Sequence, residues 1–381
     1  MLTFFKKLAE NKEKMRFSNL AQWEITIPFY VISFLLISFL AGFLGGLIVN
    51  NYFNQNNISL YQAEKNKILP RVSTRELEAR DVNRSLTASL VGIYLKKSKS
   101  ADSLGSSYSI FDLKGSGFVL TNDGWIITTK KAIDSFQPQR YVVISNDGRL
   151  FSLAKIIADP ASEAIFAKIK SEDKIENLPP VLFTDSSSTL TGDDLFVIDQ
   201  MGSVITAKVL NQSTYQAEKK EDLIQSTDKF SKIMLVGARG QSQNLVGAPL
   251  FNLKGEVAGV ILAYDNNEIE ALPVNYFKDK VNQLLKTEAI KRNYLGINYL
   301  DLADVYLFAE NSYQNTAGVL IAKNKIGQSI AKDSPAAKAG LRENDIILAV
   351  EKDTLSKFNN LTEIVQQYPA ASTLIFKIRR Q

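Results

Sequence analysis

The sequence predicts a mainly β protein that follows an N-terminal transmembrane helix and ends in a smaller α+β domain. Three observations predict this class. Residues 25–49 run for 25 residues without a charged side chain. Short runs rich in Val, Ile, Phe and Tyr then follow one another, with Asn-Asp-Gly turns at 122–124 and 146–148 between them. Towards the C-terminus, similar runs alternate with two helical segments.

The uncharged stretch at 25–49 is long enough to cross a hydrocarbon core of roughly 30 Å. A cleaved signal peptide would have a shorter apolar region and a small-residue cleavage site, whereas polar Asn50 and Asn51 follow here. Five basic residues precede the stretch, and none lies between Asn50 and Gln62. The positive-inside rule therefore predicts a single-pass protein with residues 1–24 in the cytoplasm and its domains in the periplasm or at the cell surface.

The composition and the pattern of apolar residues divide the chain after the membrane segment into a stalk and two domains. Residues 50–80 are polar and predict a linker without recognisable chemistry. From 81 to 288, the β runs and their turns predict a barrel or sandwich, which a helical stretch at 275–285 closes. Within this region the charged segment 212–232 is expected to be an exposed loop or short helix.

Residues 290–381 mix strands with two predicted helices. In the first, Ser334 can cap the helix, Pro335 suits the first turn and Gly340 fits the exit. The second helix has apolar residues at i, i+3, i+4 and i+7, namely Leu361, Ile364, Val365 and Tyr368. These patterns predict a small α+β domain.

Composition excludes several classes of active site. The chain has no cysteine, which removes disulfides, thiol nucleophiles and Cys-ligated zinc. It also has no histidine, the usual general base near neutral pH and the commonest metal ligand. We therefore expect no metal site and no cofactor. The net charge is +5, of which residues 1–24 hold 5 − 3 = +2, so the rest holds +3 and shows no footprint for nucleic acid.

Several phrases of the sequence resemble the HtrA family, which joins a trypsin-like serine protease domain to a C-terminal PDZ domain. The protease phrases are GSGFVLTNDGWIITTKKAI at 115–133, DPASEAIFAKI at 159–169, LTGDDLFVID at 190–199 and NLVGAPLFNLKGEVAGVILA at 244–263. The PDZ phrases are YLGI at 294–297 and SPAAKAGLRENDIILAV at 334–350. The resemblance implies a trypsin-like double β-barrel at 81–288, a PDZ domain at 290–381 and a homotrimer.

All three catalytic positions of the family are substituted in this chain. The resemblance places the histidine position on Lys131, the aspartate position on Glu163 and the nucleophile position on Val246. Valine has no nucleophilic atom, and a triad needs the base and its orienting carboxylate as well. The resemblance therefore implies a pseudoprotease with no catalytic residues. The alternative is an active serine endopeptidase with a non-standard site, such as Ser242 with Lys131 as the base.

What the sequence retains is the peptide-binding part of the family pattern. A PDZ domain adds an extended C-terminal peptide to a sheet edge, and backbone amides of a short loop bind its carboxylate. By resemblance, the loop and its strand comprise Tyr294, Leu295, Gly296, Ile297 and Tyr299. The second groove wall would be the apolar face of the last helix, namely Leu361, Ile364, Val365 and Tyr368. The expected partners are C-terminal or unfolded peptides, and the expected role is that of a scaffold, chaperone or regulator in protein quality control.

Overall fold

A computed structural model of the chain describes most of the two predicted domains. The described residues are Phe34, Ser38, 86–98, 103–170, 178–215, 217, 219–239, 244–305, 317–356, 359–369 and 371–380. Among them, no helix has both the length and the apolar character needed to span a membrane. The predicted segments 1–24 and 50–80, and the span 25–49 apart from Phe34 and Ser38, lie outside the described residues and stay predictions.

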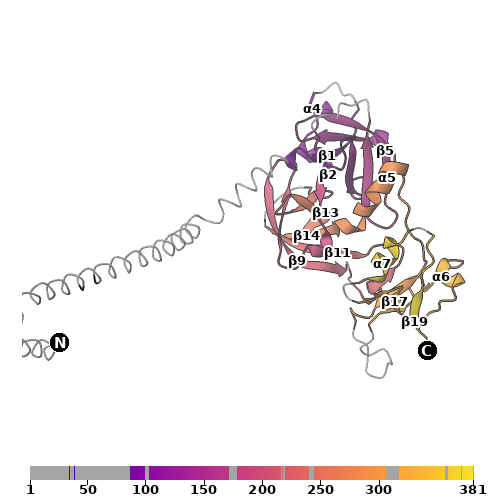
Figure 1. Ribbon diagram of the computed structural model, residues 1–381. Coiled ribbons are helices and arrows are strands. Elements are labelled where there is room, and N and C mark those ends of the chain that lie inside the picture. Colours follow the sequence, from indigo (N-terminus) through magenta and orange to yellow (C-terminus); the bar gives the residue numbers. More distant parts are fainter. Residues whose placement is uncertain are drawn as a thin grey trace, which may run out of the picture. The chain divides into compact units, whose positions relative to one another are not determined.

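The first β unit is a closed six-stranded barrel in the order β1-β2-β3-β6-β5-β4. Figure 1 shows this unit, with β1, β2 and β5 labelled. Its strands are β1 (Leu90–Leu95), β2 (Leu113–Val119), β3 (Trp125–Thr129), β4 (Tyr141–Ser145), β5 (Leu150–Ala158) and β6 (Ala164–Ile169). The two Asn-Asp-Gly turns join β2 to β3 and β4 to β5, as the hairpin pattern predicts. Three short helices accompany this barrel: α4 (Ser103–Ser106), η1 (Ile110–Asp112) and η2 (Pro138–Arg140).

The second β unit has seven described strands in the order β12-β8-β9-β11-β14-β13-β7. They are β7 (Leu182–Phe183), β8 (Asp194–Ile198), β9 (Val204–Tyr215), β11 (Lys232–Arg239), β12 (Pro249–Asn252), β13 (Glu256–Asp265) and β14 (Glu268–Pro273). Because β12 also pairs with β13, six of them form a second closed ring, with β7 added in parallel to β13. The predicted mainly β, double-barrel class is confirmed.

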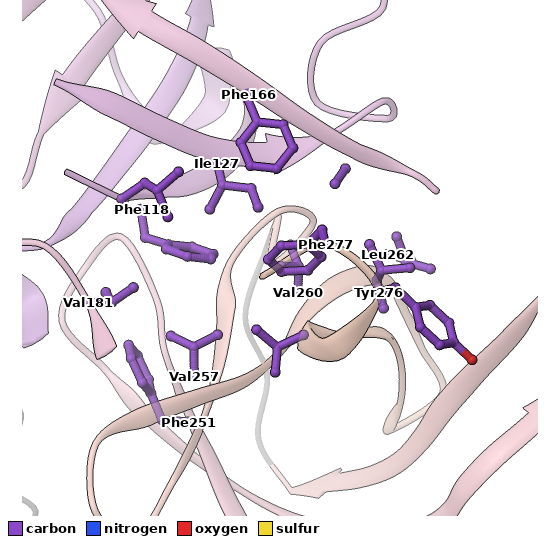
Figure 2. Close-up of a cluster of buried hydrophobic side chains, with 14 of the residues drawn as sticks. Phe118, Ile127, Phe166, Val181, Phe251, Val257, Val260, Leu262, Tyr276 and Phe277 are labelled. Atoms are coloured by element: carbon purple, nitrogen blue, oxygen red, sulfur yellow. The ribbon is translucent and has the colours of Figure 1, made fainter. Parts of the chain in front are cut away.

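One apolar cluster lies between the two rings and takes side chains from both. Figure 2 shows part of it, including Phe118, Ile127 and Phe166 from the first barrel and Phe251, Val257 and Val260 from the second. Removing each such side chain from water stabilises the fold by roughly 1.5–3 kcal/mol. The packing between the barrels therefore fixes how the loops at their junction meet.

The predicted helix at 275–285 is wrong in its first half. Two 3-10 turns, η5 (Val274–Tyr276) and η6 (Lys278–Lys280), precede a short helix α5 (Val281–Thr287). Phe277 between the turns has φ −134° and ψ −19°, which is not helical. This backbone directs its ring into the cluster between the barrels, edge-to-face with Phe166 at a centroid distance of 6.3 Å (Figure 2). Burial of Phe277 thus overrides the helical pattern.

The C-terminal domain is a sheet with two short helices. Its strands are β15 (Asn298–Asp301), β16 (Val319–Ile321), β17 (Ile346–Val350), β18 (Asp353–Thr354) and β19 (Phe376–Arg379). Its helices are α6 (Pro335–Lys338) and α7 (Leu361–Gln367). The predicted cap is confirmed, because the Ser334 hydroxyl accepts a hydrogen bond from the Ala337 amide and Pro335 opens the helix. Asn360 caps α7 by accepting from the Thr362 amide.

The charged segment 212–232 differs most from its predicted character. After β9 it forms η4 (Lys220–Leu223) and then β10 (Ile224–Ser226). A further short helix of the peptidase domain, η3 (Ser186–Ser188), lies earlier in the chain, between β7 and β8. Strand β10 joins the C-terminal sheet, whose order is β10-β15-β16-β17-β18 with β19 beside β17. Gln225 and Thr227 are buried, so the expectation of an exposed loop is wrong here. All described residues from 86 onward belong to one compact unit.

Candidate functional site

The nucleophile position, Val246, lies in a tight turn before β12. The Ala248 amide donates to the Leu245 carbonyl at 2.9 Å, and the Val246 carbonyl accepts from the Ser116 amide at 2.7 Å. Gly247 has φ 84°, and a Cβ there would lie 2.1 Å from the Ser116 carbonyl oxygen. Only glycine fits such a position. The turn is thus closely held, but the side chain that it presents is aliphatic.

The histidine position, Lys131, follows β3 and is exposed, while the next residue, Ala132, is buried. A Cβ at Gly115 would lie 2.5 Å from the Ala132 Cβ and 2.9 Å from the Val246 carbonyl oxygen. The loop that carries Lys131 and the turn that carries Val246 therefore meet at Gly115. The fold therefore brings the loop of Lys131 close to the turn of Val246, but the Lys131 side chain stays exposed.

The aspartate position, Glu163, immediately precedes β6 and is exposed. Its carbonyl accepts from the Lys130 amide at 3.0 Å, and its Oε1 lies 3.5 Å from Lys130 Nζ. Lys130 Nζ also donates to the Ser162 carbonyl at 2.6 Å. Glu163 thus pairs with Lys130 at the surface, where such an ion pair contributes little.

Two hydroxyl groups lie beside the Val246 turn, and each donates to a backbone carbonyl. Thr128 Oγ1 donates to the Ser116 carbonyl at 2.6 Å, and Ser116 Oγ donates to the Asn244 carbonyl at 3.4 Å. A serine-type site needs a hydroxyl within hydrogen-bond reach of a base. Ser242, the residue of the alternative site, lies outside the described residues. In the described part of this turn, neither hydroxyl is arranged as a nucleophile.

The second candidate site is the region between β15 and α7, which corresponds to the predicted peptide groove and which residues 224–228 occupy. The loop before this strand presents two amides, Leu295 N and Gly296 N, which donate to the same oxygen, Asp228 Oδ1, at 3.0 and 3.2 Å. Gly296 has φ 79°, and a Cβ there would lie 2.6 Å from the Ser334 Cβ. Glycine therefore lets the loop turn its amides towards a carboxylate while it packs against the start of α6.

The structure gives the groove a polar wall on α7. Thr362 Oγ1 donates to the Ser226 carbonyl at 2.9 Å, and Gln366 Nε2 donates to the Thr227 carbonyl at 3.1 Å. The residues predicted for this wall lie elsewhere on the helix. Leu361, Ile364 and Val365 are buried in the core of the domain, together with Ile297 and Tyr299.

Tyr294 and Tyr368 are the two remaining residues predicted for the groove. Tyr294 is 55% exposed. Tyr368 packs against the core, and its hydroxyl donates to Asp353 Oδ2 at 3.3 Å. The hydroxyl of buried Tyr299 contacts Gln225 Oε1 at 3.1 Å and Asn360 Oδ1 at 2.9 Å. Among the predicted residues, the structure therefore brings Leu295, Gly296, Ile297 and Tyr299 together with 224–228.

Sequence reasoning missed five residues that line or fill this groove: Gln225, Thr227, Asp228, Thr362 and Gln366. Their polar side chains leave no apolar periodicity, so 224–228 has the composition of a loop. The i, i+4 spacing of Thr362 and Gln366 is the one signal for a second face on α7. Nothing in the sequence around either segment indicates that β10 lies opposite this face of α7.

Buried polar contacts join β11 and η5 of the peptidase domain to the C-terminal domain. Lys232 is 5% exposed, and its Nζ lies 3.7 Å from Asp301 Oδ2 and 3.4 Å from Asp304 Oδ2. Burial raises the pKa of Asp301. The hydroxyl of Tyr276 in η5 donates to Oε1 of Glu363 on α7 at 3.0 Å, and burial raises the pKa of Glu363. The groove is therefore built from residues of both domains.

Comparison with known proteins supports the same two-domain organisation. Residues 115–260 match a trypsin-like peptidase domain, and residues 328–380 match a PDZ domain. The periplasmic serine endoprotease DegP of Escherichia coli (strain K12) is 27% identical over 289 residues, which cover 72% of this chain and 56% of the relative. A probable periplasmic serine endoprotease DegP-like of Brucella suis biovar 1 (strain 1330) is 26% identical over 261 residues, 66% of this chain and 47% of the relative.

A solved structure shows a similar fold over most of the described domains. The HtrA-type protease AlgW with a tripeptide superimposes with a TM-score of 0.59 at 18% identity, covering 79% of this chain and 92% of that one. The chain spans about half the length of the curated relatives it matches. With its trypsin-like peptidase domain and C-terminal PDZ domain, the chain is a homologue of the HtrA/DegP proteins.

Proposed function

We propose that this chain is a catalytically inactive HtrA homologue that binds extended peptides in the groove between β15 and α7. Its ligands are free C-termini or segments of unfolded proteins, and its role is that of a scaffold, chaperone or regulator in protein quality control. The observation that carries the proposal is the pair of amides of Leu295 and Gly296, which converge on one carboxylate oxygen. Backbone amides of this kind are how PDZ domains bind a terminal carboxylate.

The edge of β15 supports peptide binding as well. Segment 224–226 lies antiparallel to β15, with Gln225 opposite Tyr299 and Ser226 opposite Asn298. An edge that takes a strand of this chain has the geometry to take a peptide, because the main-chain hydrogen bonds depend little on sequence. The AlgW structures contain a tripeptide or a decapeptide, which places peptide ligands among the solved HtrA-type proteins.

The inactivity part of the proposal is supported by the three substituted positions. The chain contains no histidine, Val246 stands at the nucleophile position, and Lys131 is exposed. A lysine acts as a base near neutral pH only when burial or a neighbouring charge lowers its pKa, and an exposed lysine lacks the first of these conditions. The peptidase domain then serves as a support for the PDZ groove.

We further propose that the domains lie outside the cytoplasm and are tethered by residues 25–49. The five-to-none asymmetry of basic residues supports this orientation. The names of both curated relatives describe them as periplasmic. A protease added outside cells with a permeable outer envelope is expected to digest the domains while the inner membrane is intact. Protection of the domains until lysis would reverse the orientation.

Titration of the full-length chain with ten-residue peptides tests the binding function. Peptides that end in an apolar residue with a free carboxylate are expected to bind about 10- to 150-fold more tightly than the same peptides with an amidated end. This range corresponds to roughly 1.5–3 kcal/mol for a hydrogen bond to a charged group. Lys131→Ala should bind like the wild type, because Lys131 is an exposed residue that follows β3 of the peptidase domain and is not one of the predicted groove residues. Equal affinity for the free and the amidated peptides would refute the assignment of the carboxylate-binding loop.

A further inference from the structure

We propose that residues 224–228 are a built-in ligand that occupies the PDZ groove and competes with external peptides for it. The inference rests on the proposed peptide-binding function and adds its regulation. A free C-terminus would bind only after this segment leaves β15. The contacts of the segment with the sheet edge, the carboxylate loop and α7 each support this reading.

The main chain of the segment continues the sheet as a bound peptide would. Ile224, Gln225 and Ser226 pair antiparallel with Leu300, Tyr299 and Asn298. The Thr227 amide then donates to the Ile297 carbonyl at 3.0 Å, and the Ile297 amide donates to Thr227 Oγ1 at 3.2 Å. The pairing therefore reaches from β15 into the loop that would bind a peptide terminus.

Asp228 stands where a peptide would present its terminal carboxylate. One of its side-chain oxygens accepts hydrogen bonds from the Leu295 and Gly296 amides, as a chain terminus would. The chain does not end at this point, so the side chain supplies the negative charge that a terminus would otherwise bring. A free peptide carboxylate and Asp228 would need the same two donors and exclude each other.

The segment is also held by α7, and the side chains of two of its residues are closed to solvent. Thr362 and Gln366 donate to the carbonyls of Ser226 and Thr227. Thr227 is 0% exposed and Gln225 is 3% exposed. With both groove walls in contact with the segment, a second extended chain has no room beside β15.

The segment is part of the same chain, so it competes at a high effective concentration. A short tether gives an effective concentration of roughly millimolar, against which a free peptide must compete. The tether is also anchored on the peptidase side. The Phe230 ring stacks on Tyr276 at a centroid distance of 4.1 Å, and the Phe230 amide donates to the Ala161 carbonyl at 2.8 Å. Release of the segment would therefore strain contacts beside the turn that carries Glu163.

A reversible lock tests the proposal, because the chain has no cysteine of its own. Ser226 and Asn298 are opposite each other, and Asn298 directs its amide and carbonyl to Ser329 and Ala322 on the other side of β15. They therefore form a non-hydrogen-bonded pair, in which side chains approach most closely and a disulfide fits best. The double variant Ser226→Cys with Asn298→Cys can be studied oxidised and reduced in the same full-length protein.

The oxidised double variant is expected to bind the free-carboxylate peptides at least tenfold more weakly than the same protein after reduction. Asp228→Ala should bind them at least tenfold more tightly than the wild type, because it frees the Leu295 and Gly296 amides. Glu221→Ala is the matched control, since Glu221 is an exposed acidic residue of η4 just before β10. It should leave peptide affinity unchanged.

The outcomes separate this inference from the proposed function. If oxidised and reduced forms bind equally well and Asp228→Ala changes nothing, the built-in ligand is refuted while peptide binding stands. If no form binds any peptide, including Asp228→Ala, both the groove function and the competition are refuted. Weaker binding on oxidation together with tighter binding by Asp228→Ala is the result that only a competing segment explains.

Discussion

The purified full-length chain is expected to leave unfolded casein uncut and to remain unlabelled by a fluorophosphonate probe. In triad enzymes, loss of the nucleophile or of the base alone lowers kcat by about 10⁶-fold. Here the nucleophile position is Val246, the base position is exposed Lys131, and Glu163 pairs with Lys130. Gel assays of casein over many hours and in-gel detection of the probe measure both effects.

The catalytic test has two controls that the chain itself supplies. Val246→Ser restores a hydroxyl without a base, and it should stay unlabelled because Lys131 remains solvated. Ser242→Ala removes the serine nearest in sequence to the nucleophile position. If the wild type is labelled and Ser242→Ala is not, the chain has a rearranged active site, and the inactive reading fails.

Asp159→Ala is expected to lower the free energy of unfolding by about 3–5 kcal/mol, the range for removing one partner of a buried ion pair. Asp159 is 0% exposed and the Arg292 side chain 7% exposed, with Arg292 Nε donating to Asp159 Oδ1 at 2.8 Å. Asp159 also accepts from the Ala161 amide at 3.0 Å and from Ser162 Oγ at 2.7 Å. Its loss leaves the guanidinium buried without a counter-charge. Chemical denaturation of the wild type and the variant measures the difference.

An exposed ion pair of the C-terminal domain provides the control for this stability measurement. Lys323 Nζ lies 3.0 Å from Glu343 Oε1, and their side chains are 57% and 36% exposed. Glu343→Ala should lower the free energy of unfolding by no more than about 1 kcal/mol. A similar small loss for Asp159→Ala would mean that Arg292 finds another partner or reaches solvent.

The sequence was sufficient for the features that depend on local chemistry. Runs of β-branched residues and Asn-Asp-Gly turns predicted the barrels, and Ser334 with Pro335 predicted the start of α6. Gly247, in the turn of Val246, and Gly296 both have a positive φ and a close neighbour that leaves no room for a Cβ, which agrees with the glycines of the family pattern at these positions. The turn and capping rules act within a few residues and are visible in a sequence, whereas the neighbours that restrict these two glycines, Ser116 and Ser334, are distant in the chain.

The sequence was not sufficient where distant polar residues meet. Gln225 and Asn360 are 135 positions apart, and their side chains bond at 3.2 Å. Neither residue type predicts burial by itself, because a buried amide side chain needs hydrogen-bond partners that the local sequence does not reveal. The helix face predicted for the groove, which includes Leu361 and Ile364, packs in the core of the domain, because the burial of apolar side chains stabilises the fold.

The strand pairing of β10 with β15 means that the boundary between the domains in sequence is not a boundary in folding. The edge of the C-terminal sheet is completed by a strand that precedes it by some seventy positions, as Gln225 opposite Tyr299 shows. During synthesis from the N-terminus, 224–228 is made before β15, so the later domain folds against a strand that is already present. Residues 290–381 alone would expose an unpaired β edge, which favours association with other chains.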